Sequence, residues 1–220
     1  MHVFENIAQR KIVPVIAVES CESALPLADA LLDGELPLAE ITFRTVAAAE
    51  VIRTLSDKRP ELLVGAGTVL TLDNLRAAID SGAKFGVAPG FNLKIVQAAK
   101  ERNFPFIPGV CTPTEIEAAL ASGCQILKFF PAGAAGGIAM LKALYGPYAH
   151  TGIQFMPTGG VSPANVKEYL DTKGVLACGG TWIAGKEDVA AGKWDVIAAR
   201  CREAVQLISA QPAFDKQRSA

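Results

Sequence analysis

The chain has 220 residues, half of them hydrophobic, and 21 Lys and Arg residues stand against 22 Asp and Glu residues. The formal net charge of −1 excludes the basic surface of a nucleic-acid-binding protein and the polybasic anchor of a membrane-bound protein. No uncharged apolar stretch approaches the roughly 18 residues of a membrane-spanning helix, and the first residues lack the pattern of a secretory signal. We therefore expect a soluble cytoplasmic protein.

Short apolar or β-branched runs alternate with segments of helical spacing along the chain. The runs predict strands at 12–18, 38–43, 62–65, 85–88, 106–109, 126–130, 154–157 and 175–178. The segments between and after them predict helices at 24–32, 47–55, 72–80, 93–100, 114–121, 138–144, 164–170 and 194–208. Strands that alternate with helices indicate parallel pairing through right-handed crossovers.

We therefore expect an α/β fold, namely a (β/α)8 TIM barrel with an N-terminal helix, and a doubly wound open sheet is the alternative. The barrel would be a single domain that spans residues 1–220, of which 211–220 would be a frayed tail. In such a barrel the loops at the carboxyl ends of the strands build the active site. Polar or glycine-rich residues do follow the predicted strands.

Lys128 lies inside the apolar run Ile126-Leu127-Lys128-Phe129-Phe130-Pro131. An ammonium group in a buried strand must be paired, reach water or lose its proton, because desolvation disfavours the charged form. An amine that has lost its proton attacks carbonyl carbon, as in Schiff-base enzymes. The alternative is a lysine at a strand end whose stem packs while its head group reaches solvent.

Four further side chains are expected to face the same barrel mouth as Lys128. Side chains alternate along a strand, so Glu40, Thr42 and Arg44 share one face of the second strand, and Lys128 and Phe130 share one face of the sixth. If both faces point inward, a carboxylate, a guanidinium and an amine converge. The alternative is a Glu40–Arg44 salt bridge that ties the barrel layers together.

Two glycine pairs follow the last two predicted strands, in Thr158-Gly159-Gly160 and in Gly179-Gly180-Thr181. Barrels frequently hold phosphate between these two loops. Backbone N–H groups at a helix start, with the macrodipole behind them, bind phosphate well, and we expect a helix to start directly after the first pair. The alternative is that the glycines only allow tight turns.

Three other patterns limit the chemistry. Residues 65–70 lack the third glycine of the dinucleotide-binding motif, so close approach to a small ligand, or a tight turn, is expected there. The five cysteines are scattered and odd in number, which argues against a disulfide framework or a structural zinc site. The only histidines are His2 and His150, so we expect chemistry without imidazole, metal or cofactor.

Together these segments resemble the class I 2-keto-3-deoxy-6-phosphogluconate (KDPG) aldolases of the KDPG/KHG aldolase family, which serve the Entner–Doudoroff pathway. The similarity covers nearly the whole chain in order, at 40–45, 65–70, 88–90, 107–109, 128–132, 157–163 and 179–182. Lys-Phe-Phe-Pro at 128–131 and Pro-Thr-Gly-Gly at 157–160 are its most specific parts.

The resemblance implies a Schiff-base aldolase that cleaves KDPG to pyruvate and D-glyceraldehyde 3-phosphate. It implies that Lys128 is the nucleophile, Glu40 the general acid and base, and Arg44 the ligand of the pyruvate carboxylate. The other substrate-binding residues that it implies are Thr68, Pro89, Phe130, Thr158, Gly159, Gly160, Gly180 and Thr181. It further implies a homotrimer, whose partners are small molecules rather than nucleic acid or membrane.

The sequence departs from the family pattern in two places. Thr181 stands where serine is common, and Glu19-Ser20 follows the first strand where some relatives carry a basic residue. The alternative substrates are 2-keto-3-deoxy-6-phosphogalactonate and 4-hydroxy-2-oxoglutarate. A phosphoribosyl-type barrel isomerase or synthase and a non-catalytic phosphometabolite-binding barrel are the alternatives from other functional classes.

Overall fold

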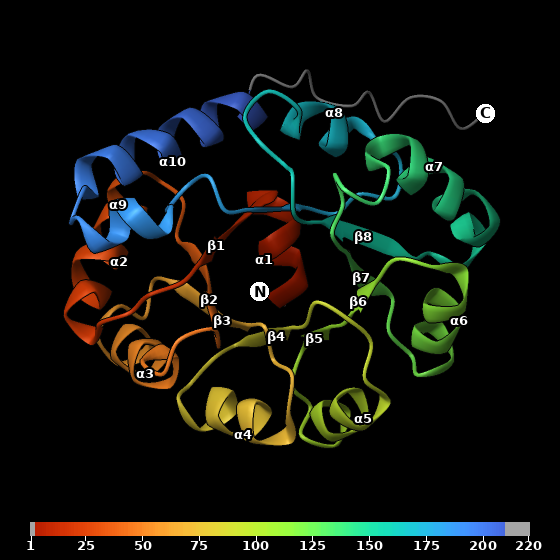
Figure 1. Ribbon diagram of the computed structural model, residues 1–220, viewed down its shortest axis with the longest axis horizontal. Helices are drawn as coiled ribbons and strands as arrows, with labels where there is room; N and C mark the ends of the chain where they lie inside the picture. The colour runs from red at the N-terminus through yellow and green to blue at the C-terminus, as the bar shows by residue number, and fades with distance from the viewer. Residues whose placement is uncertain (1–2, 210–220) are drawn as a thin grey trace.

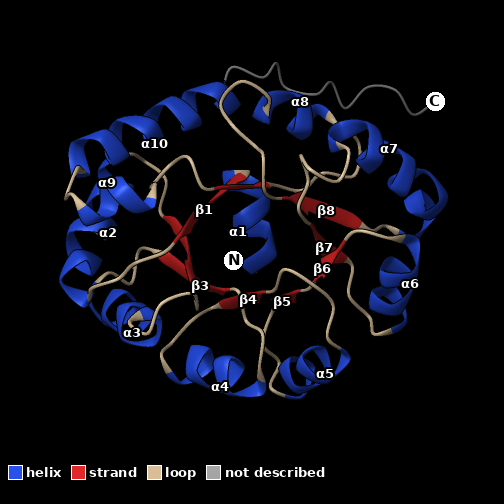
Figure 2. Ribbon diagram, viewed as in Figure 1, coloured by secondary structure: helices blue, strands red, loops and turns tan. Residues whose placement is uncertain are grey.

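The computed structural model describes residues 3–209 of the chain. The tail expected at 211–220 lies outside the described residues. The N-terminal helix is confirmed as α1, Val3–Arg10. Figure 1 and Figure 2 show the strands arranged around α1, with the other helices in an outer ring that follows chain order. No helix among the described residues is long and apolar enough to cross a membrane.

The strands lie in two parallel sheets. Their bounds are β1 Ile12–Ile16, β2 Leu38–Thr42, β3 Leu63–Gly67, β4 Phe85–Val87, β5 Phe106–Ile107, β6 Gly109–Val110, β7 Ile126–Phe129, β8 Gln154–Pro157 and β9 Cys178–Gly180. One sheet has the order β5-β4-β3-β2-β1-β9 and the other β6-β7-β8, and every pair of strands is parallel. The predicted α/β fold with a parallel sheet is therefore confirmed.

Helices connect the strands as the sequence predicts. Their bounds are α2 Ala24–Asp33, α3 Ala48–Lys58, α4 Leu72–Asp80, α5 Leu93–Glu101, α6 Pro113–Ala121, α7 Gly137–Tyr148, α8 Val166–Asp171, α9 Lys186–Ala190 and α10 Trp194–Ser209, with 3-10 turns at Cys21–Ser23 and Ala149–Thr151. The short helix α9 was not predicted. Its five residues are too few to produce a readable apolar period.

Three strands differ from the prediction. The strand expected at 175–178 lies instead at Cys178–Gly180, as β9. Cys178 donates its N–H to the carbonyl of Lys11 (2.8 Å), and the pairing with β1 runs on to Pro14↔Gly180. The strand expected at 62–65 continues to Gly67 as β3. The strand expected at 106–109 is divided into β5 and β6 at Pro108, which has no N–H for a ladder.

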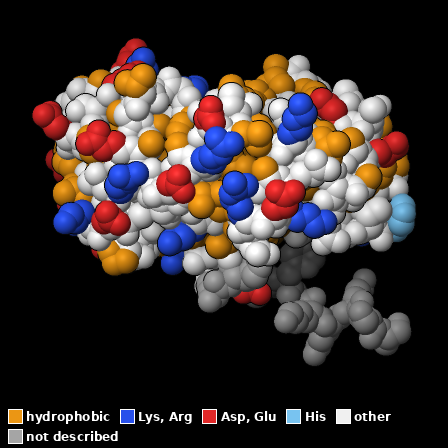
Figure 3. Space-filling model, turned by 90° about the horizontal axis from the view of Figure 1, so that it is seen from below, with side chains coloured by type: hydrophobic (Ala, Val, Ile, Leu, Met, Phe, Trp, Pro, Cys, Tyr) orange, Lys and Arg blue, Asp and Glu red, His pale blue; other side chains and the backbone are white. Residues whose placement is uncertain are grey.

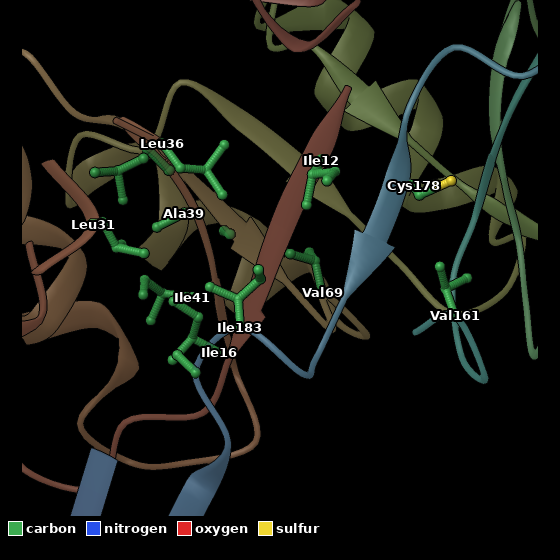
Figure 4. Packing of buried hydrophobic residues seen from close by; sticks show 14 of the residues in the cluster. Ile12, Ile16, Leu31, Leu36, Ala39, Ile41, Val69, Val161, Cys178 and Ile183 are labelled. Carbon is green, nitrogen blue, oxygen red and sulfur yellow. The ribbon is translucent and has the colours of Figure 1, made fainter. Parts of the chain in front are cut away.

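The two faces of each strand pack against different partners. On the outer face, Ile12 and Ile16 of β1 and Ala39 and Ile41 of β2 are fully buried with Leu31 of α2. Figure 4 shows these side chains gathered between the strands and the helix layer. Because a helix must bury one apolar stripe, this outer layer is the larger part of the core.

Part of the inner face is apolar. Val13, Leu38, Phe85 and Met156 are fully buried together with Ile7 of α1. Helix α1 therefore packs against this inner cluster, and the buried polar side chains Glu40, Thr42, Lys128 and Thr158 lie from the middle of their strands onward or just after them. The fold thus leaves its chemistry to one end of the strands.

The molecular surface shown in Figure 3 carries Lys and Arg side chains interspersed with Asp and Glu side chains, without a field of one sign. Such mixed charge on the face over α4 and α5 offers no electrostatic footprint for a polyanion.

Inside the protein, burial raises the pKa of the Cys178 thiol, and it raises the pKa of the Cys201 thiol to about 12. These two cysteines therefore act as small apolar residues.

Candidate active site

The central feature of the site is a buried ion pair between the two sheets. Lys128 of β7 and Glu40 of β2 lie with Nζ and Oε1 at 3.4 Å, and their side chains are 5% and 0% exposed. The predicted convergence of the amine and the carboxylate is observed. The alternative of a lysine head group in solvent does not hold, because Lys128 is buried along its whole length.

Glu40 has space because its neighbour on β3 is a glycine. A Cβ on Gly67 would overlap Oε1 and Cγ of Glu40, and a Cβ on Gly65 would overlap the ring of Phe85. The glycines at 65 and 67 thus lie within β3 and accommodate neighbouring side chains, where the sequence had suggested a loop near a ligand. Oε2 of Glu40 is buried and has no hydrogen-bond partner among residues 3–209.

An unpaired buried carboxylate oxygen is costly, so its position beside an amine indicates a binding position for a polar group. The Phe130 ring lies beside the same amine, with its centroid 5.4 Å from Nζ of Lys128. A cation so placed over an aromatic face is stabilised by the ring quadrupole. The amine is therefore enclosed by one carboxylate and one aromatic ring.

Arg44 lies at the rim rather than in the buried pair. Its side chain is exposed, and Nε donates to Oγ1 of Thr42 at 3.2 Å. Thr42 is buried and donates in turn to the carbonyl of Ile16 at 3.1 Å. A Glu40–Arg44 salt bridge is not found, because the carboxylate of Glu40 pairs with Lys128. Arg44 is thus oriented by a hydroxyl and keeps its charge at the mouth.

Two further predicted residues follow β3 and β4. Thr68, directly after β3, has a positive φ of 56°, which is uncommon for a residue other than glycine and typical of functional turns. Pro89 follows β4 and lies close to Gly109, because a Cβ on Gly109 would overlap the Pro89 carbonyl. Both residues are at the carboxyl ends of strands, on the same side as Arg44.

The glycine pair after β8 forms a left-handed turn. Gly159 and Gly160 have φ of 87° and 82°, values that residues with a Cβ rarely adopt. A Cβ on Gly159 would contact the Phe130 ring at 3.2 Å, and a Cβ on Gly160 would approach Cα of Gly133 to 3.0 Å. The turn therefore rests directly on the segment that follows Lys128.

The expectation of a helix start directly after the first glycine pair is wrong. Helix α8 begins at Val166, and Gly179 and Gly180 belong to β9, with α9 beginning only at Lys186. Ser162 and Pro163 form a turn instead, because the Asn165 side chain accepts from the Ser162 N–H (2.8 Å). An anion at this end would meet turn N–H groups rather than a helix macrodipole.

Thr158 links the two glycine segments. It is buried, its hydroxyl donates to the Met156 carbonyl at 3.3 Å, and its backbone forms an isolated parallel bridge with Gly179. A Cβ on Gly179 would overlap the Thr158 side chain. Gly180 and Thr181 follow directly, so the residues predicted for the phosphate end lie on adjacent chain segments.

Other parts of the molecule contribute less. A cavity of about 350 Å³ lies at the opposite end of the strands, lined by Phe4, Phe104, Phe106, Ile126 and Gln154 among others, and it includes none of the predicted site residues. Among residues 3–209, no three His, Cys, Asp or Glu side chains lie close enough together to hold a metal ion.

Sequence reasoning missed three residues that shape this site. Gly67 makes room for Glu40, Gly133 contacts the glycine turn, and Asn165 bonds it. Glycine at 67 could have been recognised only by knowing its register with β2, where it pairs with Thr42. Asn165 could have been noticed in the sequence as a candidate N-cap, since Asn is a frequent residue at helix N-termini.

Comparison with known proteins agrees with this geometry. The KDPG and KHG aldolase family matches residues 3–200. The chain is 47% identical over 206 residues to the 2-dehydro-3-deoxy-phosphogluconate aldolase of Haemophilus influenzae, with 94% and 96% of the two chains covered. It is 42% identical over 195 residues to the KHG/KDPG aldolase of Escherichia coli, with 89% and 91% covered.

Among solved structures, the chain resembles the KDPG aldolase of Legionella pneumophila with pyruvate captured as a covalent carbinolamine intermediate. The TM-score is 0.87 at 37% identity, and 92% of this chain and 97% of that chain are covered. The order of the strands, the buried amine and the glycine turn thus occur in a chain of which 89–94% matches these enzymes. The chain belongs to the KDPG and KHG aldolase family.

Proposed function

We propose that the protein is a class I aldolase, a carbon–carbon lyase that reversibly cleaves KDPG to pyruvate and D-glyceraldehyde 3-phosphate. The observation that carries this proposal is the buried Lys128–Glu40 pair, with Nζ and Oε1 at 3.4 Å and the second carboxylate oxygen unpaired. The captured pyruvate carbinolamine of the Legionella relative supports the same chemistry.

The first step forms the covalent intermediate. Glu40 takes up the proton that the Lys128 ammonium must lose, and the free amine attacks the C2 ketone of the substrate. Glu40 then gives this proton to the hydroxyl of the carbinolamine, which leaves as water, so that a protonated imine and the Glu40 carboxylate remain. Phe130 packs against this cation, in keeping with its ring lying 5.4 Å from Nζ.

The second step breaks the C3–C4 bond. Glu40, through a water molecule, accepts the proton of the C4 hydroxyl, and the bonding electrons move into the iminium to give an enamine. Glyceraldehyde 3-phosphate leaves. Glu40 returns the proton to C3 of the enamine, and hydrolysis of the imine releases pyruvate and restores the amine. The imine is the electron sink, so the proposal includes no cofactor.

The remaining residues bind the two ends of the substrate. Arg44, held by Thr42 at 3.2 Å, would grip the pyruvate carboxylate, with Thr68 and Pro89 shaping that end. Thr158, Gly159, Gly160, Gly180 and Thr181 would surround the phosphate. The left-handed turn at Gly159 and Gly160 supports this role, because successive N–H groups in such turns form anion-binding concavities.

A second substrate, 4-hydroxy-2-oxoglutarate, is favoured by two observations. The E. coli relative is a KHG/KDPG aldolase, and the matching family takes its description from both activities. The imine chemistry of Lys128 would be the same, since both substrates are 2-keto acids that yield pyruvate. The unphosphorylated substrate would leave the glycine turn without a ligand.

The proposal includes a complete (β/α)8 barrel formed as one domain. The chain passes from β5 to β6 through a single residue, Pro108, and the bridge between Thr158 and Gly179 joins the segments after β8 and within β9. Together with the pairing of β9 and β1, these links would close the ring.

We also propose a cytoplasmic location, which the free state of all five cysteines supports.

Borohydride reduction in the presence of pyruvate should leave a pyruvyl adduct on Lys128, because reduction converts the imine to a stable amine. Mass spectrometry of the digested protein would locate it. Lys128→Ala and Lys128→Arg should give no adduct, and Arg keeps a positive charge beside Glu40. Lys142→Ala, on the exposed side of α7, is the matched control and should be labelled normally. An adduct that persists in Lys128→Arg would disprove the mechanism.

Glu40→Gln should lower kcat by about 10²–10⁴-fold, the usual contribution of a general acid and base. It should reduce pyruvate trapping much less, because the amine is still present. Steady-state cleavage assays and trapping yields measure the two effects. Exposed Glu22→Gln is the control and should change neither. If both quantities stay at wild-type levels in Glu40→Gln, the carboxylate is structural.

Cleavage of three substrates tests the specificity. We expect the highest kcat/KM for KDPG, a lower value for its C4 epimer, the phosphogalactonate, and a lower value again for 4-hydroxy-2-oxoglutarate, which lacks the phosphate. A coupled assay that detects pyruvate serves all three. Equal kcat/KM for the two epimers would remove the assignment to KDPG while leaving the aldolase chemistry in place.

We propose a homotrimer as the assembled form. Large apolar side chains are exposed at the carboxyl ends of β2, β3 and β4: Val46 is 103% exposed, Leu70 54% and Leu93 48%. Such side chains on one rim suit contact with another copy of the chain. Light scattering should give the mass of three chains, and Val46→Glu should shift it toward one chain. A monomer at all concentrations would contradict the proposal.

A further inference from the structure

The carbonyl groups of the glycine turn after β8 are held by three hydrogen bonds. The Thr158 carbonyl accepts from the Ala132 N–H, and the Gly159 carbonyl accepts from the Gly133 N–H, both at 2.8 Å. The Gly160 carbonyl accepts from Nδ2 of Asn165 at 3.0 Å. Three consecutive carbonyls are therefore fixed by three separate donors.

Fixing a carbonyl also fixes the N–H of the next residue. A trans peptide is planar, and its N–H points opposite to its C=O. The bond from Gly133 therefore directs the Gly160 N–H away from the segment after β7, and the bond from Asn165 directs the Val161 N–H away from Asn165. Among residues 3–209, neither the Gly160 N–H nor the Val161 N–H has a hydrogen-bond acceptor, so both remain available to an anion.

Among residues 3–209, Asn165 is the one donor to these three carbonyls that uses a side chain. Its Oδ1 accepts from the Ser162 N–H at 2.8 Å while its Nδ2 donates to the Gly160 carbonyl at 3.0 Å. It is also the residue before α8, yet its side chain caps no N–H of that helix. The side chain thus serves the glycine turn and not the helix, which distinguishes it from the other Asn N-cap, Asn92, whose side chain accepts from the Lys94 N–H.

We propose that Asn165 is a positioning residue for the substrate phosphate, and that it acts by holding the Gly160–Val161 peptide so that its N–H faces the anion. This inference rests on the proposed function, since it assigns the glycine turn to phosphate. Asn165 does not touch the substrate in this account. Its effect is confined to substrates that carry a phosphate.

Substitution of Asn165 separates this role from helix capping. Asp and Asn are equally good N-caps, so a capping role predicts that Asn165→Asp behaves as wild type. The positioning role predicts the opposite, because Asp keeps the acceptor for Ser162 but replaces the donor with an oxygen that repels the Gly160 carbonyl and the phosphate. Asn165→Ala should raise KM for KDPG about ten-fold, the effect of one lost hydrogen bond to a charged system, and Asn165→Asp should raise it more.

Both variants should leave KM for 4-hydroxy-2-oxoglutarate within about two-fold of wild type and should trap pyruvate normally, because neither process uses the phosphate end. Asn92→Asp is the matched control at another N-cap and should change neither KM. A wild-type KM for KDPG in Asn165→Asp, or an equal rise in KM for both substrates, would overturn the proposal. Loss of trapping and cleavage in the wild-type protein would instead refute the proposed function itself.

Gly133→Ala tests the same turn from the opposite side, and it serves if the Asn165 variants do not fold. Its Cβ would lie 3.2 Å from Cα of Gly160 and 3.4 Å from the Gly159 carbonyl oxygen, so the turn must shift by a few tenths of an ångström. KM for KDPG should rise while KM for 4-hydroxy-2-oxoglutarate does not. Gly146→Ala on α7 is the control, because a Cβ there meets nothing within 4 Å. No selective change in Gly133→Ala would likewise contradict the proposal.

Discussion

The pairing of Lys128 with Glu40 is the constraint to which the rest of the site is adapted. Both side chains are withdrawn from water, and the desolvation of two charges offsets most of their mutual attraction. An apolar pair of similar volume would serve stability at least as well. The ion pair is therefore better explained by a chemical role than by stability, and the rest of the structure must offset the free energy of its desolvation.

A glycine beside the pair provides the space that the Glu40 side chain occupies. Gly67 has no Cβ, which would overlap the Glu40 side chain. Ile7 of α1 packs in the inner apolar cluster. The carboxylate is left with one free oxygen. A fully satisfied carboxylate would be more stable but could not exchange protons with a substrate, because its lone pairs would already be occupied.

Much of this arrangement could be predicted from the sequence. The alternation of apolar runs and helical segments gave the parallel α/β fold, and period-two alternation placed Glu40 and Lys128 on facing surfaces. The strand made of Cys178, Gly179 and Gly180 could not be predicted, since glycines are poor strand formers and their pairing with β1 depends on contacts far along the chain. The helix start after Gly160 was predicted wrongly because the side chain of Asn165 stabilises a turn that competes with the helix.

Side chains form the end of the site around Lys128, whereas backbone groups form the end at the glycine turn. The segment after β7 connects the two ends. Recognition at the imine end depends on side chains whose positions are set by strand register, as for Lys128 opposite Met156. Recognition at the glycine turn depends on the backbone, which has no register of its own and must be held by other groups. The N–H groups of Ala132 and Gly133 supply part of that hold, and they lie four and five residues beyond Lys128. The turn is therefore fixed by backbone hydrogen bonds beyond β7, while the register of β7 with β8 fixes the amine.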